Sequence, residues 1–367
     1  MEVIEPRDEI GDRILLTPGP LTTTKSVKEA MLKDIGSWDA DLVGLVRDIR
    51  QGLLEVAGLG EDYSCTLMQG SGTFSVESVV SSVVPPTGKV LIIVNGAYGE
   101  RLVSMAEIHR IPHTVLRCAE DRIPVIEEVE RELARDSQIS HVIAVHCETT
   151  TGILNPIHEI GLLAKRYSKS TIVDAMSSFG AYEIDMTSSH IDHLISSANK
   201  CIEGVPGFGF TLSRREALLL AKDGARSLSL NLYDQWQYFE KAGQFRYTPP
   251  THVLLAFRQA LSEFKAEGGI QVRGRRYREN HRVLMQGMKK MGFRSFLDEE
   301  IQSYIITAFY YPESFNFQSF YDRLRRRGYI IYPGKLTHLD TFRIGTIGSI
   351  GKEQIEGLLE AIRSIQR

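Results

Sequence analysis

The sequence lacks the features that mark membrane, secreted and metal-binding proteins. It has only four cysteines, at positions 65, 118, 147 and 201, and no two of them show the CxxC spacing of a zinc or redox site. No apolar run reaches the length of about eighteen residues that a membrane-spanning helix needs. The acidic first residues also lack the apolar stretch of a signal peptide. We therefore expect a cytoplasmic protein with reduced thiols and no membrane segment.

Acidic residues outnumber basic ones only slightly, with 46 Asp and Glu against 43 Lys and Arg. The formal net charge is −3 at pH 7, which argues against a polyanion-binding surface and so against nucleic acid as a partner. Two arginine clusters, at 273–278 and 323–327, are therefore interpreted as solvated helix faces. Pro112 interrupts the histidine pair 109/113, and the pair 190/193 lacks an acid or thiol ligand set. We predict no metal site.

The length and the order of apolar runs predict an α/β protein of two domains. A chain of 367 residues exceeds the size at which one hydrophobic core stops growing. Apolar runs without polar alternation, separated by helix-like stretches, are typical of a mostly parallel sheet that helices cover on both faces. The predicted strands lie at 65–68, 90–94, 113–116, 141–146, 171–173, 193–195 and 208–212.

The pattern changes after residue 251. A long helix-like segment, a basic helix and two further strand-like runs follow. We predict a large domain at 15–255 and a smaller α/β domain at 256–367, with segment 1–14 packing near the smaller one.

Two charged residues stand at the ends of neighbouring predicted strands. Lys200 follows the run 193–195, and Asp174 directly follows 171–173. Pyridoxal phosphate (PLP) chemistry needs this pair: the lysine amine holds the cofactor as a Schiff base, and the carboxylate keeps the pyridine nitrogen protonated. Taken alone, such a pair is more often a solvated lysine and a loop-capping aspartate.

Other predicted strands also end in polar or aromatic residues. Ser71 and Thr73 open a predicted helix, where backbone N–H groups and the helix dipole can hold a phosphate. Tyr98 follows another strand and could lie flat against a cofactor ring. The threonine run 149–151 offers hydroxyls to a cofactor or a substrate. Taken alone, the Ser71–Thr73 segment and the threonine run are more typical of ordinary turns, and Tyr98 is equally typical of a first helical turn.

In this order along the chain, the motifs resemble those of the fold-type I PLP-dependent aminotransferases. The resemblance is to the small-chain branch that includes alanine–glyoxylate and serine–pyruvate aminotransferases, and within it to the enzymes that act on 2-aminoethylphosphonate and pyruvate. It covers nearly the whole chain. The motifs that carry it lie at 16–20, 69–72, 95–99, 146–152, 173–180, 196–200, 204–208, 226–230, 249–252, 331–335 and 342–345.

This resemblance implies a large domain with a mostly parallel sheet flanked by helices, a smaller α/β C-terminal domain, PLP as cofactor and a site for it. Lys200 would bind PLP covalently and move the proton between the substrate carbon and the cofactor, and Asp174 would pair with the pyridine nitrogen. The remaining cofactor-binding residues implied are Ser71, Gly72, Thr73, Tyr98, Thr149, Asn199 and Thr248.

The resemblance further implies substrates and a partner. Arg343 would bind the acidic end of 2-aminoethylphosphonate or pyruvate. Active sites in the family lie at a dimer interface, so Thr248 would reach the cofactor phosphate of the other subunit of a homodimer. Relatives carry a tyrosine near this threonine where this chain has Phe245, which weakens the predicted contact.

Two alternatives to the 2-aminoethylphosphonate–pyruvate reaction remain open. One keeps the chemistry but changes the substrates, as in alanine–glyoxylate or serine–pyruvate transamination. The other is a PLP-dependent lyase such as a cysteine desulfurase, which uses a thiolate nucleophile. Cys201 is next to Lys200, but adjacent residues at a strand end point to opposite faces, so we expect Cys201 in the core.

Overall fold

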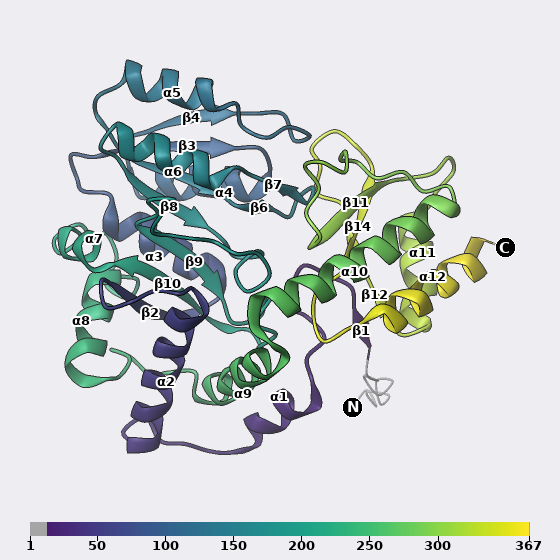
Figure 1. Ribbon diagram of the computed structural model, residues 1–367, viewed down its shortest axis with the longest axis horizontal. Coiled ribbons are helices and arrows are strands. Elements are labelled where there is room, and N and C mark those ends of the chain that lie inside the picture. Colours follow the sequence, from purple (N-terminus) through teal and green to yellow (C-terminus); the bar gives the residue numbers. More distant parts are fainter. Residues whose placement is uncertain (1–12, 367) are drawn as a thin grey trace, which may run out of the picture.

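The computed structural model describes residues 13–366. Its centre is a seven-stranded sheet (Figure 1), in which β10 is antiparallel to both neighbours and the next four strand pairs are parallel. The mostly parallel sheet predicted from the apolar runs is therefore confirmed. In spatial order the strands are β2 (Tyr63–Gly70), β10 (Gly207–Arg214), β9 (His193–Ser197), β8 (Ser170–Asp174), β5 (Ile139–Val145), β3 (Lys89–Val94) and β4 (His113–Arg117).

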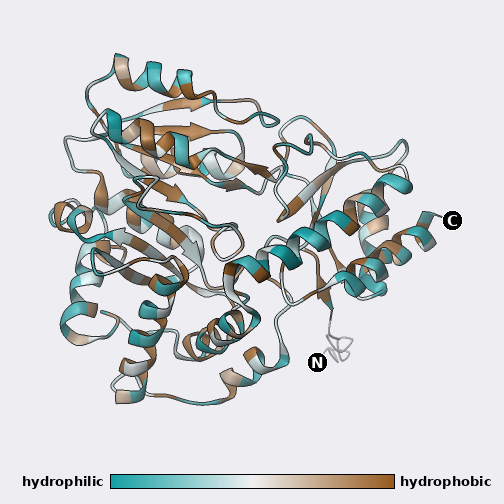
Figure 2. Ribbon diagram, in the orientation of Figure 1, coloured by the Kyte–Doolittle hydropathy of each residue, from teal (hydrophilic) through white to brown (hydrophobic). Residues whose placement is uncertain are grey.

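Helices cover both faces of this sheet, as runs of consecutive apolar residues require. In β3, Ile92 packs into one core cluster, whereas Leu91 and Ile93 pack into another on the opposite face. The first face is covered by α3 (Gly72–Val83), α4 (Ala97–Ile108) and α7 (Arg215–Leu220), and the second by α2 (Ala40–Val56), α5 (Ile126–Arg135), α6 (Ile157–Arg166) and α9 (Thr251–Glu267). Figure 2 shows the brown, apolar strands between helices of mixed colour.

Shorter elements complete the region around the large sheet. The helix α8 contacts β2 and α3, while α1 and η1 pack against α9. A small hairpin follows β5. These elements are α1 (Lys25–Glu29), η1 (Ala30–Leu32), β6 (Cys147–Glu148), β7 (Ile153–Leu154) and α8 (Leu232–Ala242).

A second, smaller sheet has its own apolar core. Its antiparallel strands are β11 (Ile306–Tyr310), β14 (Thr341–Gly345) and β13 (Tyr332–Pro333), accompanied by α10 (Gly269–Lys290), α11 (Phe317–Arg326) and α12 (Lys352–Gln366). The strand β1 (Ile14–Leu15) pairs with β12 (Tyr329–Ile330), so the described N-terminal residues join this smaller unit.

The predicted domain boundary at residue 255 falls inside α9, whose apolar side chains belong to the core of the large sheet. The division at 15–255 and 256–367 stays a prediction. Of the segment 1–14 that was expected near the small domain, residues 1–12 lie outside the described residues. Within residues 13–366, no helix is long and apolar enough to cross a membrane.

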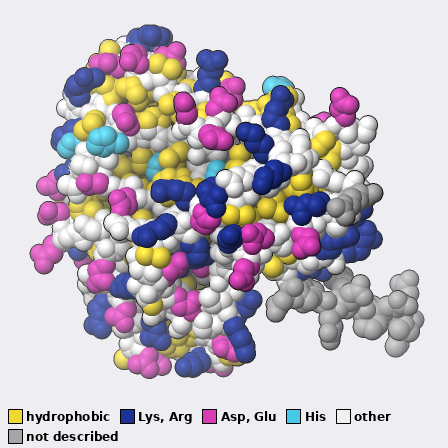
Figure 3. Space-filling model, turned by 45° about the vertical axis from the view of Figure 1, so that its right-hand side comes forward, with side chains coloured by type: hydrophobic (Ala, Val, Ile, Leu, Met, Phe, Trp, Pro, Cys, Tyr) yellow, Lys and Arg dark blue, Asp and Glu magenta, His cyan; other side chains and the backbone are white. Residues whose placement is uncertain are grey.

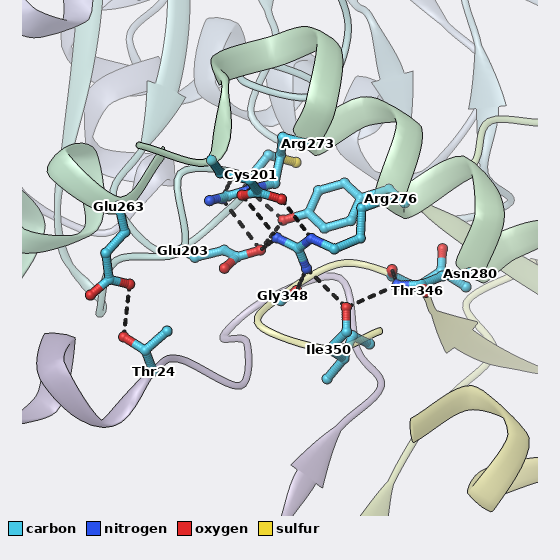
Figure 4. A network of polar contacts seen from close by, with 12 residues as sticks. Thr24, Cys201, Glu203, Glu263, Arg273, Arg276, Asn280, Thr346, Gly348 and Ile350 are labelled. Carbon is cyan, nitrogen blue, oxygen red and sulfur yellow. Dashed lines mark hydrogen bonds and ion pairs between the residues drawn. The ribbon is translucent and has the colours of Figure 1, made fainter. Parts of the chain in front are cut away.

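The expectation of two solvated arginine clusters is correct for 325–327 and wrong for two arginines of α10. Arg325, Arg326 and Arg327 are exposed, and basic and acidic side chains are interspersed on the face seen in Figure 3. Arg273 is only 2% exposed, and Arg276 is half-buried. Both point into a polar network between the two sheets (Figure 4). Their shared partner Glu203 comes from a distant part of the sequence, and their other partner, Glu267, ends the preceding helix α9, so the pattern within the arginine cluster did not reveal them.

Candidate active site

The carboxyl ends of five strands meet at one edge of the large sheet. Strand β2 is parallel to β9, because β10 lies between them and is antiparallel to both. The segments that follow β2, β3, β5, β8 and β9 therefore converge, as ligand-binding segments do in open α/β sheets. A cavity of about 170 Å³ lies here. Among the residues that line it are the predicted Ser71, Gly72, Thr73, Tyr98, Asp174, Asn199 and Lys200.

Lys200 lies just beyond β9 and is partly buried. Its Nζ donates a hydrogen bond to the Pro18 carbonyl, at 2.6 Å. A Cβ atom added to Gly19 would lie 2.9 Å from Nζ, and Gly19 has φ +123°, so only glycine fits this close approach. Burial lowers the pKa of the Lys200 amine, which favours the neutral, nucleophilic form.

Asp174 is the last residue of β8 and is 6% exposed. Its Oδ1 accepts a hydrogen bond from the Met176 N–H at 2.9 Å, and the described residues give Oδ2 no hydrogen-bond donor. Burial raises the pKa of this carboxyl group to about 6. A buried carboxylate needs a cationic partner, and a protonated ring nitrogen in the cavity would supply one.

The first turn of α3 has the features of an anion site. Ser71 is its N-cap, with extended backbone, yet its side chain makes no capping hydrogen bond. The hydroxyl and the free N–H groups of this turn therefore remain available to a phosphate. A Cβ atom added to Gly72 would lie 2.2 Å from the Met176 sulfur, so the site also depends on glycine here. Asn199 lies beside it, with Oδ1 accepting from the Ser197 hydroxyl at 3.1 Å.

Arg101 also lines this cavity, and the sequence analysis missed it. Its Nη1 donates to the Thr73 hydroxyl at 3.0 Å, which adds a positive charge to the anion site. The available signal was its spacing, since Arg101 follows Tyr98 by three residues on a helix and such residues share a face.

A buried glutamate from another segment holds the first turn of α4, which carries Tyr98. Glu148 is fully buried, and its Oε2 accepts hydrogen bonds from the N–H groups of Tyr98 and Gly99, each at 3.2 Å. The carboxyl group thus caps the helix. Cations lie near the Tyr98 ring: the guanidinium carbon of Arg101 is 4.8 Å and the Lys335 Nζ 5.1 Å from its centroid.

The phenol of Tyr98 is also influenced by these surroundings. Burial by itself raises its pKa, but neighbouring cations, Lys200 foremost, hold it below the ordinary value. The predicted role of Tyr98, stacking on a cofactor ring, stays a prediction.

Arg343 lies on β14 and is 1% exposed. Its Nη1 donates to the Thr149 carbonyl at 2.6 Å and its Nε to the Pro333 carbonyl at 3.0 Å. Arg343 thus joins the small sheet to the segment after β5, and burial lowers its pKa. These two bonds leave Nη2, rather than a wholly free fork, for a substrate anion. Neither Arg343 nor Thr149 is among the residues that line the 170 Å³ cavity.

Thr248 is exposed and does not line the cavity around Lys200. It lines a separate cavity of about 470 Å³ together with Gly70 and Phe74, which flank the anion site. Phe245 is 7% exposed and packs edge-on against Phe239. It therefore faces the interior of its own chain.

Cys201 is fully buried, as expected, and its thiol donates to the Ser177 carbonyl at 3.2 Å. Burial raises its pKa, so the nucleophilic thiolate is disfavoured. No cysteine lines the cavity around Lys200. Among residues 13–366, no cluster of three or more His, Cys, Asp or Glu side chains could hold a metal ion.

Comparison with known proteins identifies the family of this chain. Residues 33–337 match the family model described as aminotransferase class-V. The chain is 53% identical to a 2-aminoethylphosphonate–pyruvate transaminase of Bacillus mycoides (strain KBAB4), over 95% of this chain and 96% of that protein.

Solved structures also share the fold. An alanine–glyoxylate aminotransferase of Nostoc sp. superimposes with a TM-score of 0.91 at 23% identity, over 100% of this chain and 98% of that one. The ureidoglycine–glyoxylate aminotransferase of Bacillus subtilis gives 0.89 at 24% identity, over 100% and 94%. At these identities the likeness concerns the fold alone, and it confirms the predicted fold.

Proposed function

Because this chain belongs to the class-V aminotransferase family, we propose that it moves the amino group of 2-aminoethylphosphonate to pyruvate, giving phosphonoacetaldehyde and L-alanine. One observation carries the proposal: Lys200 and the buried Asp174 line one cavity beside an anion site. The substrate pair is supported by the 53% identity to a relative of that name.

The residues around the cavity fit PLP, which we propose as the cofactor. Ser71, Gly72 and Thr73 would hold its phosphate at the start of α3, with Asn199 beside them. Asp174 would pair with the ring nitrogen, since its Oδ2 has no hydrogen bond within the described residues. When bound, PLP supplies an electron sink that stabilises negative charge on the amino-bearing carbon of the substrate.

Lys200 has two proposed tasks. It would hold the cofactor covalently, and its amine would move a proton from the amino-bearing carbon of the substrate to the cofactor. The lowered pKa of Lys200 suits both tasks, because each requires the neutral amine. The loop of Pro18 and Gly19 covers the amine on one side and would restrict the access of water there.

Arg343 is the proposed receptor for the acidic end of both substrates. It is a buried guanidinium close to Tyr98 and Thr149, and charge-assisted hydrogen bonds to phosphonate or carboxylate oxygens are strong. Its bonds to the Thr149 and Pro333 carbonyls would fix its position before the substrate arrives, which reduces the cost of ordering the side chain.

We further propose a homodimer in the cytoplasm with active sites shared between subunits. Thr248 is exposed beside the partly exposed apolar side chains of Phe74 and Tyr247, which are 49% and 42% exposed. Such apolar side chains around one cavity suit a subunit contact. The four cysteines are free thiols, as expected in a reducing compartment.

A donor screen with pyruvate as acceptor tests the proposed function. The PLP-loaded protein is mixed with 2-aminoethylphosphonate, L-serine, L-alanine or L-cysteine, and the cofactor spectrum is followed. We expect rapid bleaching by 2-aminoethylphosphonate, bleaching by L-alanine as the reverse of the pyruvate half-reaction, and weak responses to L-serine and L-cysteine. Reaction with serine or alanine but not with 2-aminoethylphosphonate would favour the other transaminases, and sulfide release from cysteine would favour a desulfurase.

A further inference from the structure

Lys335 reaches the active site from the small sheet. It follows β13, and its Nζ lies 5.1 Å from the centroid of the Tyr98 ring, on the first turn of α4. The residue before it makes a tight connection, since the Gly334 N–H donates to the Thr341 carbonyl at 2.8 Å. A Cβ atom at Gly334 would lie 2.1 Å from the Thr341 hydroxyl oxygen, so a larger residue would displace this connection and Lys335 with it.

The same loop is also held on the side of the large sheet. The Thr337 N–H and hydroxyl donate to the Glu120 carboxylate at 3.4 and 3.3 Å. Lys335 lies between this contact and Gly334. The loop therefore spans from the small sheet to the large one, and Lys335 is kept near Tyr98 from both ends.

Within residues 13–366, the ammonium group of Lys335 forms no ion pair, and the residue is exposed. Lys200 and Arg343 also act on the Tyr98 phenol. Lys335 and Arg343, the group proposed to bind the substrate anion, are thus both neighbours of Tyr98.

The two proposed substrates differ in the charge that such a group would meet. A phosphonate ionises twice, like a phosphate, which carries about −1.5 to −2 at pH 7, whereas the carboxylate of pyruvate carries a single charge. Arg343 alone neutralises the carboxylate. A phosphonate leaves about 0.5 to 1 further negative charge without a partner.

We propose that Lys335 is the second cation of the substrate site and determines its preference for phosphonate over carboxylate. This inference rests on the proposed function, whose substrate pair it explains. Arg343 serves both half-reactions, and Lys335 contributes mainly to the one that begins with the phosphonate.

The test separates the two half-reactions by single-turnover spectroscopy: the donor half-reaction starts from the PLP form of the enzyme, and the pyruvate half-reaction starts from the aminated cofactor form that the donor produces. One arm measures kcat/KM for 2-aminoethylphosphonate and the other for pyruvate, in Lys335→Met, Lys335→Arg and the wild type. We expect Lys335→Met to lower kcat/KM for 2-aminoethylphosphonate about tenfold, the scale of one charge-assisted hydrogen bond. It should lower kcat/KM for pyruvate less than about twofold. Lys335→Arg should restore most of the loss, since it keeps the charge.

A matched control is Lys290→Met, which removes one exposed lysine charge at the end of α10 and should leave both arms unchanged. If Lys335→Met lowered kcat/KM equally for both substrates, Lys335 would only position Tyr98 or its loop, and the proposal would be overturned. Unchanged kcat/KM for both substrates would overturn it as well.

A binding measurement distinguishes failure of this inference from failure of the proposed function. Ethylphosphonate and propanoate are titrated calorimetrically, which requires no turnover. We expect the wild type to prefer ethylphosphonate and Lys335→Met to lose about tenfold of that preference. An unchanged preference overturns the role of Lys335 even if 2-aminoethylphosphonate reacts. Failure of the wild type to react with 2-aminoethylphosphonate refutes the proposed function, while the titration still decides on Lys335.

Discussion

Replacing Glu203 by glutamine removes the charge at the centre of the network between the two sheets. Glu203 is 5% exposed. Its Oε1 accepts from the Tyr277 hydroxyl at 2.5 Å and from Arg276 Nη2 at 2.8 Å, and lies 3.3 Å from Arg273 Nη1 (Figure 4). The backbone N–H of Glu203 also donates to the Lys200 carbonyl at 2.7 Å. The network therefore begins directly behind the proposed catalytic lysine.

The size of the effect follows from the partners that remain. Removing one member of a buried ion pair costs about 3–5 kcal/mol, because the other charge stays buried. Arg273 keeps its bonds to Glu267 and to the Cys201 carbonyl, at 2.5 and 2.7 Å, and glutamine keeps an acceptor for Tyr277. We therefore expect the lower end, about 3 kcal/mol, for Glu203→Gln and a larger loss for Glu203→Ala.

Urea unfolding of the cofactor-free protein measures this loss as a lower midpoint at unchanged slope. The matched control is Glu55→Gln, whose ion pair with Lys265, at 2.6 Å, is half exposed on both sides. Exposed pairs contribute about 0–1 kcal/mol. If Glu203→Gln and Glu55→Gln differed by less than about 0.5 kcal/mol, the network would not contribute to stability as argued.

The same network predicts how stability depends on acid. Burial acts to raise the pKa of Glu267, but the hydrogen bond from Arg276 and the charges of Arg273 and Arg276 bring it below its ordinary value. A lowered carboxyl pKa contributes stability that is full above about pH 4.3 and is lost as the pH falls toward the folded-state pKa. In Glu267→Gln, this part of the acid-induced loss of stability should disappear from the unfolding midpoints.

Further predictions concern the site itself. Lys200→Ala should bind PLP only non-covalently and lose nearly all turnover; borohydride reduction and peptide mapping that tagged another lysine in the wild type would contradict this. Asp174→Asn should lower turnover at least about a hundredfold with little loss of stability. Because burial raises the pKa of Asp174 to about 6 and the ionised form pairs with the ring, PLP affinity should be full above pH 6 and fall below it, a dependence that Asp174→Asn removes; equal profiles would exclude the role. Arg343→Ala should lose about thirtyfold to several thousandfold of kcat/KM for both substrates, with Arg343→Lys recovering part, while PLP stays covalently bound. Lys200→Ala mixed with Thr248→Ala should regain activity through hybrid dimers, and a monomer in sedimentation would rule out shared sites.

The sequence predicted those parts of the fold that depend on local apolar runs. Each predicted strand of the large sheet lies within or overlaps an observed strand, because buried parallel strands are continuous apolar segments that need no distant partner to be recognised. The direction of β10 and the pairing of β1 with β12 were not predicted. Both depend on which distant strands become neighbours, and a single sequence does not carry that information.

In the candidate site, too, the features that depend on local sequence were predicted and those that depend on distant neighbours were not. Lys200, Asp174 and Ser71 each lie at or just beyond the end of a strand, so the rule that strand ends converge brought them together correctly. Arg101 and Lys335 were missed because neither stands at a strand end of the large sheet. Arg273 was misinterpreted because its acidic partners, Glu203 and Glu267, come from other segments.

The central claim is that nitrogen passes from 2-aminoethylphosphonate to pyruvate at Lys200. Its most direct test uses 2-aminoethylphosphonate labelled with ¹⁵N, unlabelled pyruvate and the PLP-loaded enzyme, with mass spectrometry of the alanine formed. We predict ¹⁵N-alanine in equal amount to phosphonoacetaldehyde in the wild type, and neither product in Lys200→Ala. Unlabelled alanine, phosphonoacetaldehyde without alanine, or full activity of Lys200→Ala would contradict the account.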